Sequence, residues 1–345
     1  MTAERVRRFL SAGARLADAH DPLGRQARER LPLSTGLSAE GVSYALEHCL
    51  EACPDAAALE QICASQPRAP RVHIVLSANV FTAPLRAIAL ALASSDRVYV
   101  RASRREPVMT ELLQQACPGQ FEIVDTIRPG AGDHVFAYGA DETLAAIANT
   151  LASGVVYHAH GFGYGAVVLD AAACASADTA RRLALDLALF DQQGCLSPRF
   201  GVVHAPLEST LAFASDLATA LDEWHERLPR GRLAADVIEA NVRYRESMTF
   251  VGECCLTTAA GSVAVMHDPP HFPLPPVGRN LLLLCVSDWR TPLVNNAARL
   301  TELGIAGAFD ELPPGLEQVR RSPLGQMQTP PFDGPVDRRA RPRVA

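Results

Sequence analysis

The chain has 345 residues and a mass of 36.9 kDa, which corresponds to about two ordinary domains and excludes a disulfide-stabilised miniature protein. Hydrophobic residues make up 48% of it and charged residues 20%, the composition of a folded globular protein and not of a disordered one. The formal net charge of −6 argues against the basic surface of a general nucleic-acid binder, so no nucleic acid is expected as a partner.

Targeting signals and some reaction chemistries are also excluded by composition. No uninterrupted apolar run approaches the ~20 residues of a membrane-spanning helix, and the first residues lack the apolar core of a secretory signal. We therefore expect a cytoplasmic protein without a membrane span. All 32 basic residues are arginines, which excludes chemistry that needs a lysine amine. The nine cysteines include no CxxC pair and are interpreted as reduced thiols.

The first half of the chain alternates between helical and β-rich segments. Residues 1–65 have apolar side chains at helical spacing and end in a Pro-containing break at 66–70. Strands are then predicted at 72–77, 97–101, 121–124, 134–138 and 155–158, and helices at 83–95, 107–116 and 141–152. This alternation favours a doubly wound, largely parallel sheet of the Rossmann-like kind.

The second half continues with mixed α/β elements. Strands are predicted at 165–170, 200–204, 262–267 and 280–287, and helices at 177–189 and 206–228. The polar loop at 191–199 is taken as the domain boundary. The predicted fold class is α/β with two lobes: residues 1–190, a smaller lobe at 191–331, and a Pro- and Arg-rich tail at 332–345 whose last dozen residues are expected to be frayed.

One thiol, Cys195, lies in the polar, Gly-containing loop DQQGCLSPR at residues 191–199. A cysteine held by a turn at a lobe junction suits nucleophilic catalysis, because that chemistry needs an exposed and partly ionised sulfur. On residue type alone a buried structural cysteine is the alternative, since free cysteines are among the most buried residues.

The loop around Cys195 resembles the catalytic-cysteine loop of the LuxC-type acyl-CoA reductases, the reductase component of a fatty acid reductase complex and a branch of the aldehyde dehydrogenase superfamily. Further segments are similar to superfamily motifs in the same order: 76–80 (LSANV), 98–103 (VYVRAS), 138–143 (YGADET) and 321–331 (RSPLGQMQTPP). The resemblance covers residues 72–331. It implies an aldehyde dehydrogenase-like fold in which residues 1–190 bind the cofactor and residues 191–331 carry the catalytic thiol.

The implied activity is NADPH-dependent reduction of a fatty acyl thioester to an aldehyde through an acyl intermediate on Cys195. The resemblance implies that the Asn79 side-chain amide and the backbone N–H of Cys195 face the oxyanion, although a turn-forming role for Asn79 stays open. The acyl group would arrive as acyl-CoA or from an acyl-transferring partner protein. A homo-oligomer is left open, as is the length of the acyl chain.

A difference from hydrolytic aldehyde dehydrogenases favours reduction. Those enzymes carry a water-activating Glu before a Gly-Gly turn, whereas residues 157–163 here are YHAHGFG. We take His160 as the candidate for proton transfer, with His158 as the alternative, at a pKa near neutrality. A structural role for both stays open, and two histidines at i, i+2 without a third ligand are a weak metal signal, so no metal is expected.

Cofactor preference follows from the segment after the predicted second strand. A ribose 2′-phosphate favours Arg, whereas an unphosphorylated ribose favours a carboxylate. Arg101, Ser103 and Arg104 stand where the superfamily often has Lys-Pro-Ser-Glu, which predicts NADPH, and a solvated charge cluster is the alternative. Gly139 and Thr143, in the turn that opens the next helix, are expected at the cofactor pyrophosphate.

Two other functions stay open. One is a different reductase of the superfamily that acts on an acyl phosphate or an aldehyde and needs cationic groups for a small charged substrate. The other is a non-catalytic acyl-binding subunit in which Cys195 is unreactive. The superfamily's Glu-x-Phe-Gly segment, which holds the nicotinamide ribose, has no convincing counterpart in this sequence.

Overall fold

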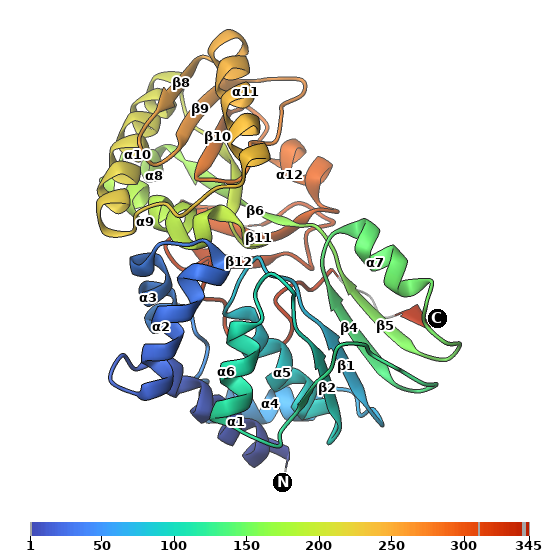
Figure 1. The fold of residues 1–345 in the computed structure, drawn as a ribbon. Coiled ribbons are helices and arrows are strands. Elements are labelled where there is room, and N and C mark those ends of the chain that lie inside the picture. Colours follow the sequence, from blue (N-terminus) through green and yellow to red (C-terminus); the bar gives the residue numbers. More distant parts are fainter. Residues whose placement is uncertain (1, 310, 340–342, 345) are drawn as a thin grey trace. The chain divides into compact units, whose positions relative to one another are not determined.

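The structure is a computed structural model that describes residues 2–309, 311–339 and 343–344 (Figure 1). The chain forms two compact units: a first unit of Met1–Phe162 with Pro331–Ala345, and a second unit of Gly163–Pro330. The division therefore falls before the strand β6 (Tyr164–Asp170) and not after residue 190. The reason is that β6 pairs with strands of the second unit, so the alternating pattern crosses from one sheet to the next without a break in the sequence.

The first unit begins with four helices, as predicted for residues 1–65: α1 (Thr2–Ala17), α2 (Pro22–Thr35), α3 (Ala39–His48) and α4 (Ala56–Ser65). The side chains of Asp21, Ser38 and Asp55 accept backbone N–H groups at the first turns of α2, α3 and α4. Helix α1 packs closely on the later helix α5 (Ala83–Ser94). Gly13 allows this close approach, because a Cβ added there would lie only 2.5 Å from Leu85 Cδ1.

A six-stranded sheet forms the centre of the first unit, with strand order β13-β5-β4-β1-β2-β3. Its parallel strands are β1 (Val72–Val75), β2 (Val98–Arg101), β3 (Glu122–Ile123), β4 (His134–Tyr138) and β5 (Val156–His160). Helices α5 and α6 (Val108–Ala116) pack against β1 to β3, and α7 (Asp141–Ala148) packs against β5. These bounds confirm the predicted doubly wound pattern to within a few residues.

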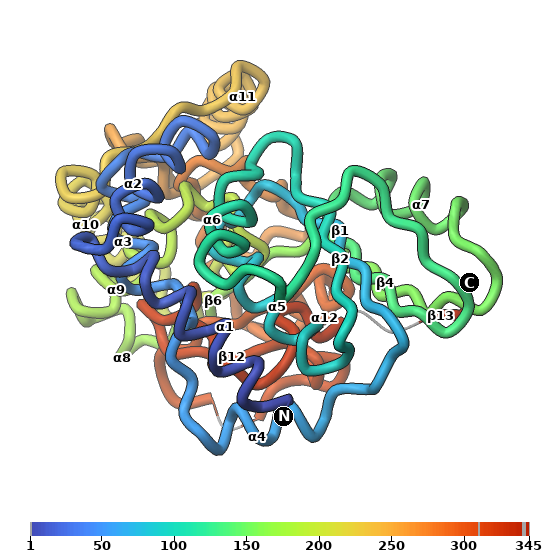
Figure 2. The backbone as a smooth tube through the Cα atoms, turned by 60° about the horizontal axis from the view of Figure 1, so that its bottom comes forward, coloured from blue at the N-terminus to red at the C-terminus, as the bar shows by residue number. Residues whose placement is uncertain are grey.

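The segment expected as a frayed tail is part of the first unit. Its strand β13 (Arg343–Val344) pairs antiparallel with β5 and forms the outer edge of the sheet. Figure 2 marks β13 beside the C-terminus. Arg86 of α5 holds the start of this segment, donating to the carbonyl oxygens of Pro331 at 2.8 Å and Gly334 at 2.9 Å. The expectation of fraying is therefore wrong for the described part, because a buried guanidinium and a strand pairing fix it.

The second unit has a seven-stranded sheet of order β12-β11-β6-β7-β10-β9-β8, parallel except for the pairing of β8 with β9. The strands besides β6 are β7 (Pro198–His204), β8 (Cys254–Thr257), β9 (Ser262–His267), β10 (Asn280–Cys285), β11 (Leu300–Ala306) and β12 (Arg320–Pro323). The helical elements are α8 (Ala171–Cys174), α9 (Ala177–Ala188), the 3-10 turn η1 (Leu189–Gln192), α10 (Leu207–Arg227), α11 (Ala235–Val251) and α12 (Arg290–Asn296).

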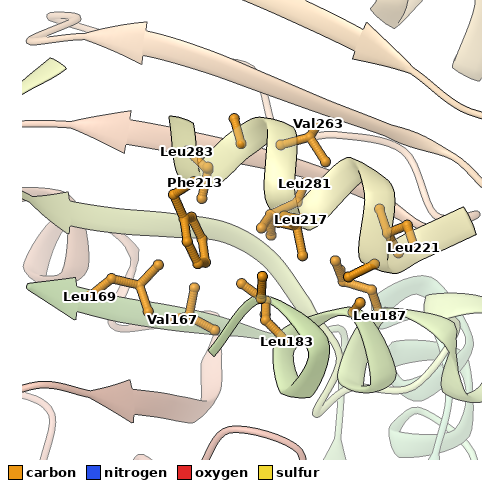
Figure 3. Close-up of a cluster of buried hydrophobic side chains, with 14 of the residues drawn as sticks. Val167, Leu169, Leu183, Leu187, Phe213, Leu217, Leu221, Val263, Leu281 and Leu283 are labelled. Carbon is orange, nitrogen blue, oxygen red and sulfur yellow. The ribbon is translucent and has the colours of Figure 1, made fainter. Parts of the chain in front are cut away.

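Both faces of the second sheet are buried. On one face, apolar side chains of α9 and α10 pack against β6, β9 and β10 (Figure 3). On the other face, a second cluster includes residues of α11 and α12 together with Phe200 and Leu282. Burial on both faces explains the nearly continuous apolar runs of β6 and β10 in the sequence. Within the part of the chain that is described, no helix is long and apolar enough to cross a membrane.

Candidate active site

Cys195 lies in a turn between η1 and β7, at the amino ends of the central strands of the second sheet. Its side chain is half-buried, and the turn is closed by the Ser197 N–H, which donates to the Gly194 carbonyl at 3.1 Å. The structure thus places this thiol in a turn, as predicted from the loop composition. Its catalytic role stays a prediction.

Two adjacent strands, β6 and β11, fix the backbone of this turn. The Gly165 N–H of β6 donates to the Ser197 carbonyl at 2.9 Å, and a Cβ added at Gly165 would lie 2.3 Å from the Leu196 oxygen, so only glycine fits there. The Thr301 hydroxyl of β11 donates to the Cys195 carbonyl. Register shifts occur at these points in both the β6–β7 and β6–β11 pairs, and such bulges are frequent next to active sites.

The candidate residues of the first unit gather at one edge of its sheet. Strands β1, β2, β4 and β5 are parallel neighbours, so the loops that follow them emerge at the same edge. Chain order reverses at β1, with β2 on one side and β4 on the other, and ligands of open α/β sheets bind at such a switch point. Asn79, Arg101, Ser103, Gly139 and His160 lie at or just beyond these strand ends.

Asn79 is exposed in the loop between β1 and α5. It belongs to the first unit, whereas Cys195 belongs to the second. A donor role toward an oxyanion at Cys195 therefore stays a prediction.

The predicted ribose contacts surround the end of β2. Arg101 is the last residue of that strand and half-buried, and Arg104 is exposed. Neither guanidinium has a carboxylate partner among the described residues. The Ser103 hydroxyl accepts the Arg105 N–H at 3.3 Å and stabilises this turn. Two unpaired cations at a switch point suit a phosphate group.

The turn after β4 leaves space around Gly139. Its N–H donates to the His160 carbonyl at 3.2 Å, and an added Cβ would lie 3.9 Å from Thr143, an ordinary van der Waals separation. The protein therefore does not itself require glycine at this position. Thr143 is exposed in the first turn of α7, whose first residues Asp141 and Glu142 are acidic. Their charge opposes an anion at this helix end.

His160 is buried at the end of β5, where its ring stacks on Tyr138 with centroids 4.5 Å apart. Neither ring nitrogen has a hydrogen-bond partner in the described part of the structure. Burial lowers its pKa to about 4, with a smaller lowering by Arg339 and an opposing effect of Asp337. Burial and the neighbouring histidines, His134 among them, likewise lower the pKa of His158 to about 4. The expectation of a pKa near neutrality is therefore wrong for both histidines. The sequence of this short strand does not indicate that their side chains are buried, and burial disfavours the charged ring.

Some residues that shape the thiol turn were not singled out from the sequence. Gly165 and Thr301 are among them. The sequence signal for Gly165 is the glycine-rich stretch GFGYG at 161–165. The hydrogen bond from Arg279 to Asp191, which lies just before the Cys195 turn, was also missed, because the two residues are 88 positions apart in the sequence. Among the described residues, no group of three or more His, Cys, Asp or Glu side chains is placed to hold a metal ion.

Comparisons with known proteins agree with this architecture. Residues 118–263 match the family model described as Acyl-CoA reductase (LuxC), which confirms the resemblance over a segment containing Gly139, His160 and Cys195. No curated protein sequence matches the chain.

Solved structures share the fold across nearly the whole chain. An oxidoreductase from Marinobacter aquaeolei has a TM-score of 0.72 at 12% identity, over 99% of this chain and 85% of its own. Aldehyde dehydrogenase 21 from Physcomitrella patens, in complex with succinate, has a TM-score of 0.67 at 14% identity, over 100% and 86%. An NAD-dependent aldehyde dehydrogenase from Sinorhizobium meliloti has a TM-score of 0.65 at 15% identity, over 100% and 82%. The chain has the aldehyde dehydrogenase-like fold.

Proposed function

We propose that this chain, which matches the acyl-CoA reductase family over residues 118–263, reduces an acyl thioester to an aldehyde with NADPH through an acyl intermediate on Cys195. The observation that carries the proposal is the Cys195 turn: a half-buried thiol whose backbone is fixed by Gly165 and Thr301 from two adjacent strands. The aldehyde dehydrogenase-like fold supports an oxidoreductase of aldehydes or acyl groups.

The first step is acyl transfer to the protein. The Cys195 sulfur bonds to the acyl carbon, the bond from that carbon to the CoA sulfur breaks, and the thiol proton leaves with CoA. The Cys195 backbone N–H would stabilise negative charge on the acyl oxygen, and the resemblance to the superfamily implies the Asn79 amide as a second donor. Loss of one such donor typically slows acyl transfer about 10²- to 10³-fold.

The second step releases the aldehyde. When bound, NADPH would supply the hydride. The acyl carbon of acyl-Cys195 accepts it, the carbon–sulfur bond then breaks with its electron pair on sulfur, and a solvent proton restores the thiol. One acyl-CoA, one NADPH and one proton give one aldehyde, one CoA and one NADP⁺, so atoms and charge balance.

The residues at the edge of the first sheet fit the proposed cofactor. Arg101 and Arg104 have no carboxylate partner among the described residues and would hold the 2′-phosphate. The space beside Gly139 would accommodate a pyrophosphate close to the backbone, with Thr143 as a further hydroxyl contact. Asp141 and Glu142 oppose this binding electrostatically, so the arginines carry the larger part of the attraction in the proposal.

His160 enters the proposal as a neutral group. With a pKa of about 4 it is not protonated at neutral pH, so it would take part as an acceptor and not as a charged donor. Replacement of His160 by Phe tests this role. We expect reduced turnover if the imidazole moves a proton, and unchanged turnover if it only packs on Tyr138.

The proposal is tested by incubating the protein with NADPH and acyl-CoA thioesters from acetyl to palmitoyl, and measuring both NADPH oxidation and aldehyde. In parallel, the protein and acyl-CoA without NADPH are examined by intact-mass and peptide mass spectrometry for an acyl group on Cys195. Cys195→Ala is expected to abolish both signals. Cys255→Ala is the matched control, because Cys255 is also half-buried in the second unit.

Other outcomes select the alternatives. Acyl-Cys195 without NADPH oxidation would favour the acyl-binding subunit. Oxidation of NADPH by acyl phosphates but not by thioesters would favour the phospho-acyl reductase. Activity that appears only when an acyl-transferring protein supplies the acyl group would favour a partner-delivered donor. No adduct and no oxidation with any donor would contradict the proposal.

A further inference from the structure

The residues immediately before Cys195 have a backbone conformation that non-glycine residues rarely adopt. Phe190, Asp191 and Gln192 have φ values of 53°, 49° and 64°. Such a residue is strained relative to ordinary backbone conformations, and strain of this kind persists only where surrounding contacts determine it. The turn must therefore be held by the rest of the second unit.

The turn that opens β10 provides one part of this hold. Arg279, itself at φ 70°, forms an ion pair with Asp191 at 2.7 Å, and their side chains are only 2% and 3% exposed. The guanidinium also donates to the Leu228 carbonyl at 2.8 Å, and the second Asp191 oxygen accepts the Gly231 N–H at 2.8 Å. Both buried charges are thus compensated, as a buried ion pair requires.

Gln192 and Asn280 connect the same two turns one residue further along. The Gln192 side-chain oxygen accepts the Asn280 N–H at 2.9 Å, and its amide nitrogen donates to the carbonyls of Asn280 and Pro198, both at 2.6 Å. The bond to Pro198 spans the turn that contains Cys195. Both ends of that turn are thereby tied to one buried side chain, which is itself tied to β10.

We propose that Asp191, Gln192, Arg279 and Asn280 form a buried anchor that positions Cys195 for acyl transfer. The proposal rests on the proposed function of Cys195 as the acyl acceptor. Asp191, Gln192 and Arg279 act through their side chains and Asn280 through its backbone N–H and carbonyl. All four are positioning residues: they hold the strained turn in one conformation and have no contact with the acyl group in the proposed reaction. Weakening the anchor lets the turn relax toward ordinary backbone conformations, and this displaces the sulfur while the substrate-binding surfaces remain.

The test compares Asp191→Asn and Gln192→Met with wild type. Asp170→Asn is the matched control, because Asp170, like Asp191, accepts a hydrogen bond at each carboxylate oxygen, here from the N–H groups of Ala173 at 2.8 Å and Ala308 at 2.9 Å. It lies at the carboxyl end of β6, whereas the Cys195 turn lies at the amino end of that strand. The measurements are the acylation rate of Cys195 at saturating acyl-CoA, the half-saturating concentration, and hydrogen exchange of residues 190–198.

We expect both anchor variants to lower the maximal acylation rate about tenfold or more, with a half-saturating concentration within about twofold of wild type and faster exchange in residues 190–198. Asp170→Asn is expected to change neither the maximal acylation rate nor the exchange of residues 190–198, even if it lowers thermal stability as much as the anchor variants do. In a cycle with Arg279→Gln, the Asp191→Asn, Arg279→Gln double variant is expected to be no slower than the slower single variant, because the pair acts as a unit.

Wild-type acylation in both anchor variants would overturn the proposal, as would an equal loss in Asp170→Asn. If Asp191→Asn does not fold, Gln192→Met gives the same test, because it removes only neutral hydrogen bonds. If the wild type itself is not acylated, the proposed function fails, and the anchor is judged by hydrogen exchange alone. Faster exchange in residues 190–198 of the anchor variants, absent from Asp170→Asn, then supports the anchor, and unchanged exchange refutes it.

Discussion

The buried imidazole of His160 makes a quantitative prediction about acid stability. Its side chain is 6% exposed, stacks on Tyr138, and has no hydrogen-bond partner at either nitrogen among the described residues. Replacement by Phe keeps a flat ring of similar size and removes two buried polar atoms. At pH 7.5 we therefore expect His160→Phe to be at least as stable as wild type.

The pH dependence follows from the shift in pKa. The unfolded chain binds a proton at His160 near pH 6.5, and the folded protein binds it only near pH 4, because burial disfavours the charged ring. The contribution of His160 to stability is thus fully present above about pH 6.5 and is lost as the pH falls toward 4. The difference between these two pKa values corresponds to roughly 3 kcal/mol, at about 1.36 kcal/mol for each pH unit.

The assay is urea unfolding of wild type and His160→Phe at several pH values from 7.5 to 4.5. Far-UV circular dichroism follows the unfolding of both units, whereas the fluorescence of Trp224 and Trp289 reports the second unit alone, because both tryptophans lie there. Comparison of the two signals gives the transition of the first unit. The stability advantage of the variant is expected to grow by about 1.36 kcal/mol for each pH unit below about 6.

His20→Gln, at an exposed position in the first unit, is the control and is expected to follow wild type. The reasoning would be refuted by a stability difference between His160→Phe and wild type that stays constant across this pH range. A fluorescence transition of the second unit that shifts with the substitution would show that the effect is not confined to the first unit.

Three further predictions concern the cofactor edge and the second unit. Gly139→Ala is expected to leave thermal unfolding unchanged, because the added Cβ would lie 3.9 Å from Thr143, but to weaken NADPH binding about tenfold in a titration; equal affinity would contradict a pyrophosphate at Gly139. Arg104→Glu is expected to raise the KM for NADPH about tenfold or more and leave that for NADH unchanged, and a parallel change in both would remove Arg104 from the 2′-phosphate site. Burial raises the pKa of Asp186 to about 8, above its unfolded value of 3.8, although the N–H groups of Gly325 and Met327 lower it. Its contribution to stability is therefore lost as the pH rises from about 4 through 8, and Asp186→Asn is expected to flatten this decline in fluorescence-monitored unfolding from pH 5 to 9; an unchanged slope would exclude Asp186 as its source.

The alternating part of the fold was predictable from sequence because its signals are local. The apolar runs at β1, β4 and β10 and the helices α5 and α10 are each set by periodicity and side-chain burial within one segment. Other elements were missed. Helix α11 has no clear apolar stripe, and Ile238 and Phe250 on it are 51% and 87% exposed, so periodicity could not indicate it.

The unit boundary and the role of the C-terminal segment could not be predicted locally. Strand β6 follows β5 after a short glycine-containing stretch, and nothing in its own residues indicates that it pairs with β7 and β11. The C-terminal segment lacks an apolar period, and its order depends on Arg86, about 245 residues earlier in the chain. Strand pairing and a buried donor determine both outcomes.

The sequence by itself determined the chemical types at the candidate site: a thiol in a polar turn, arginines after a strand, and a glycine before a helix. Only the tertiary structure decided their environments. It placed the arginines and Gly139 at one sheet edge, lowered the pKa of His160 by burial, and tied the strained turn before Cys195 to Arg279. Residue type fixes which bonds a group can form, whereas proton affinity and position depend on solvent exclusion and on partners that lie far away in the sequence.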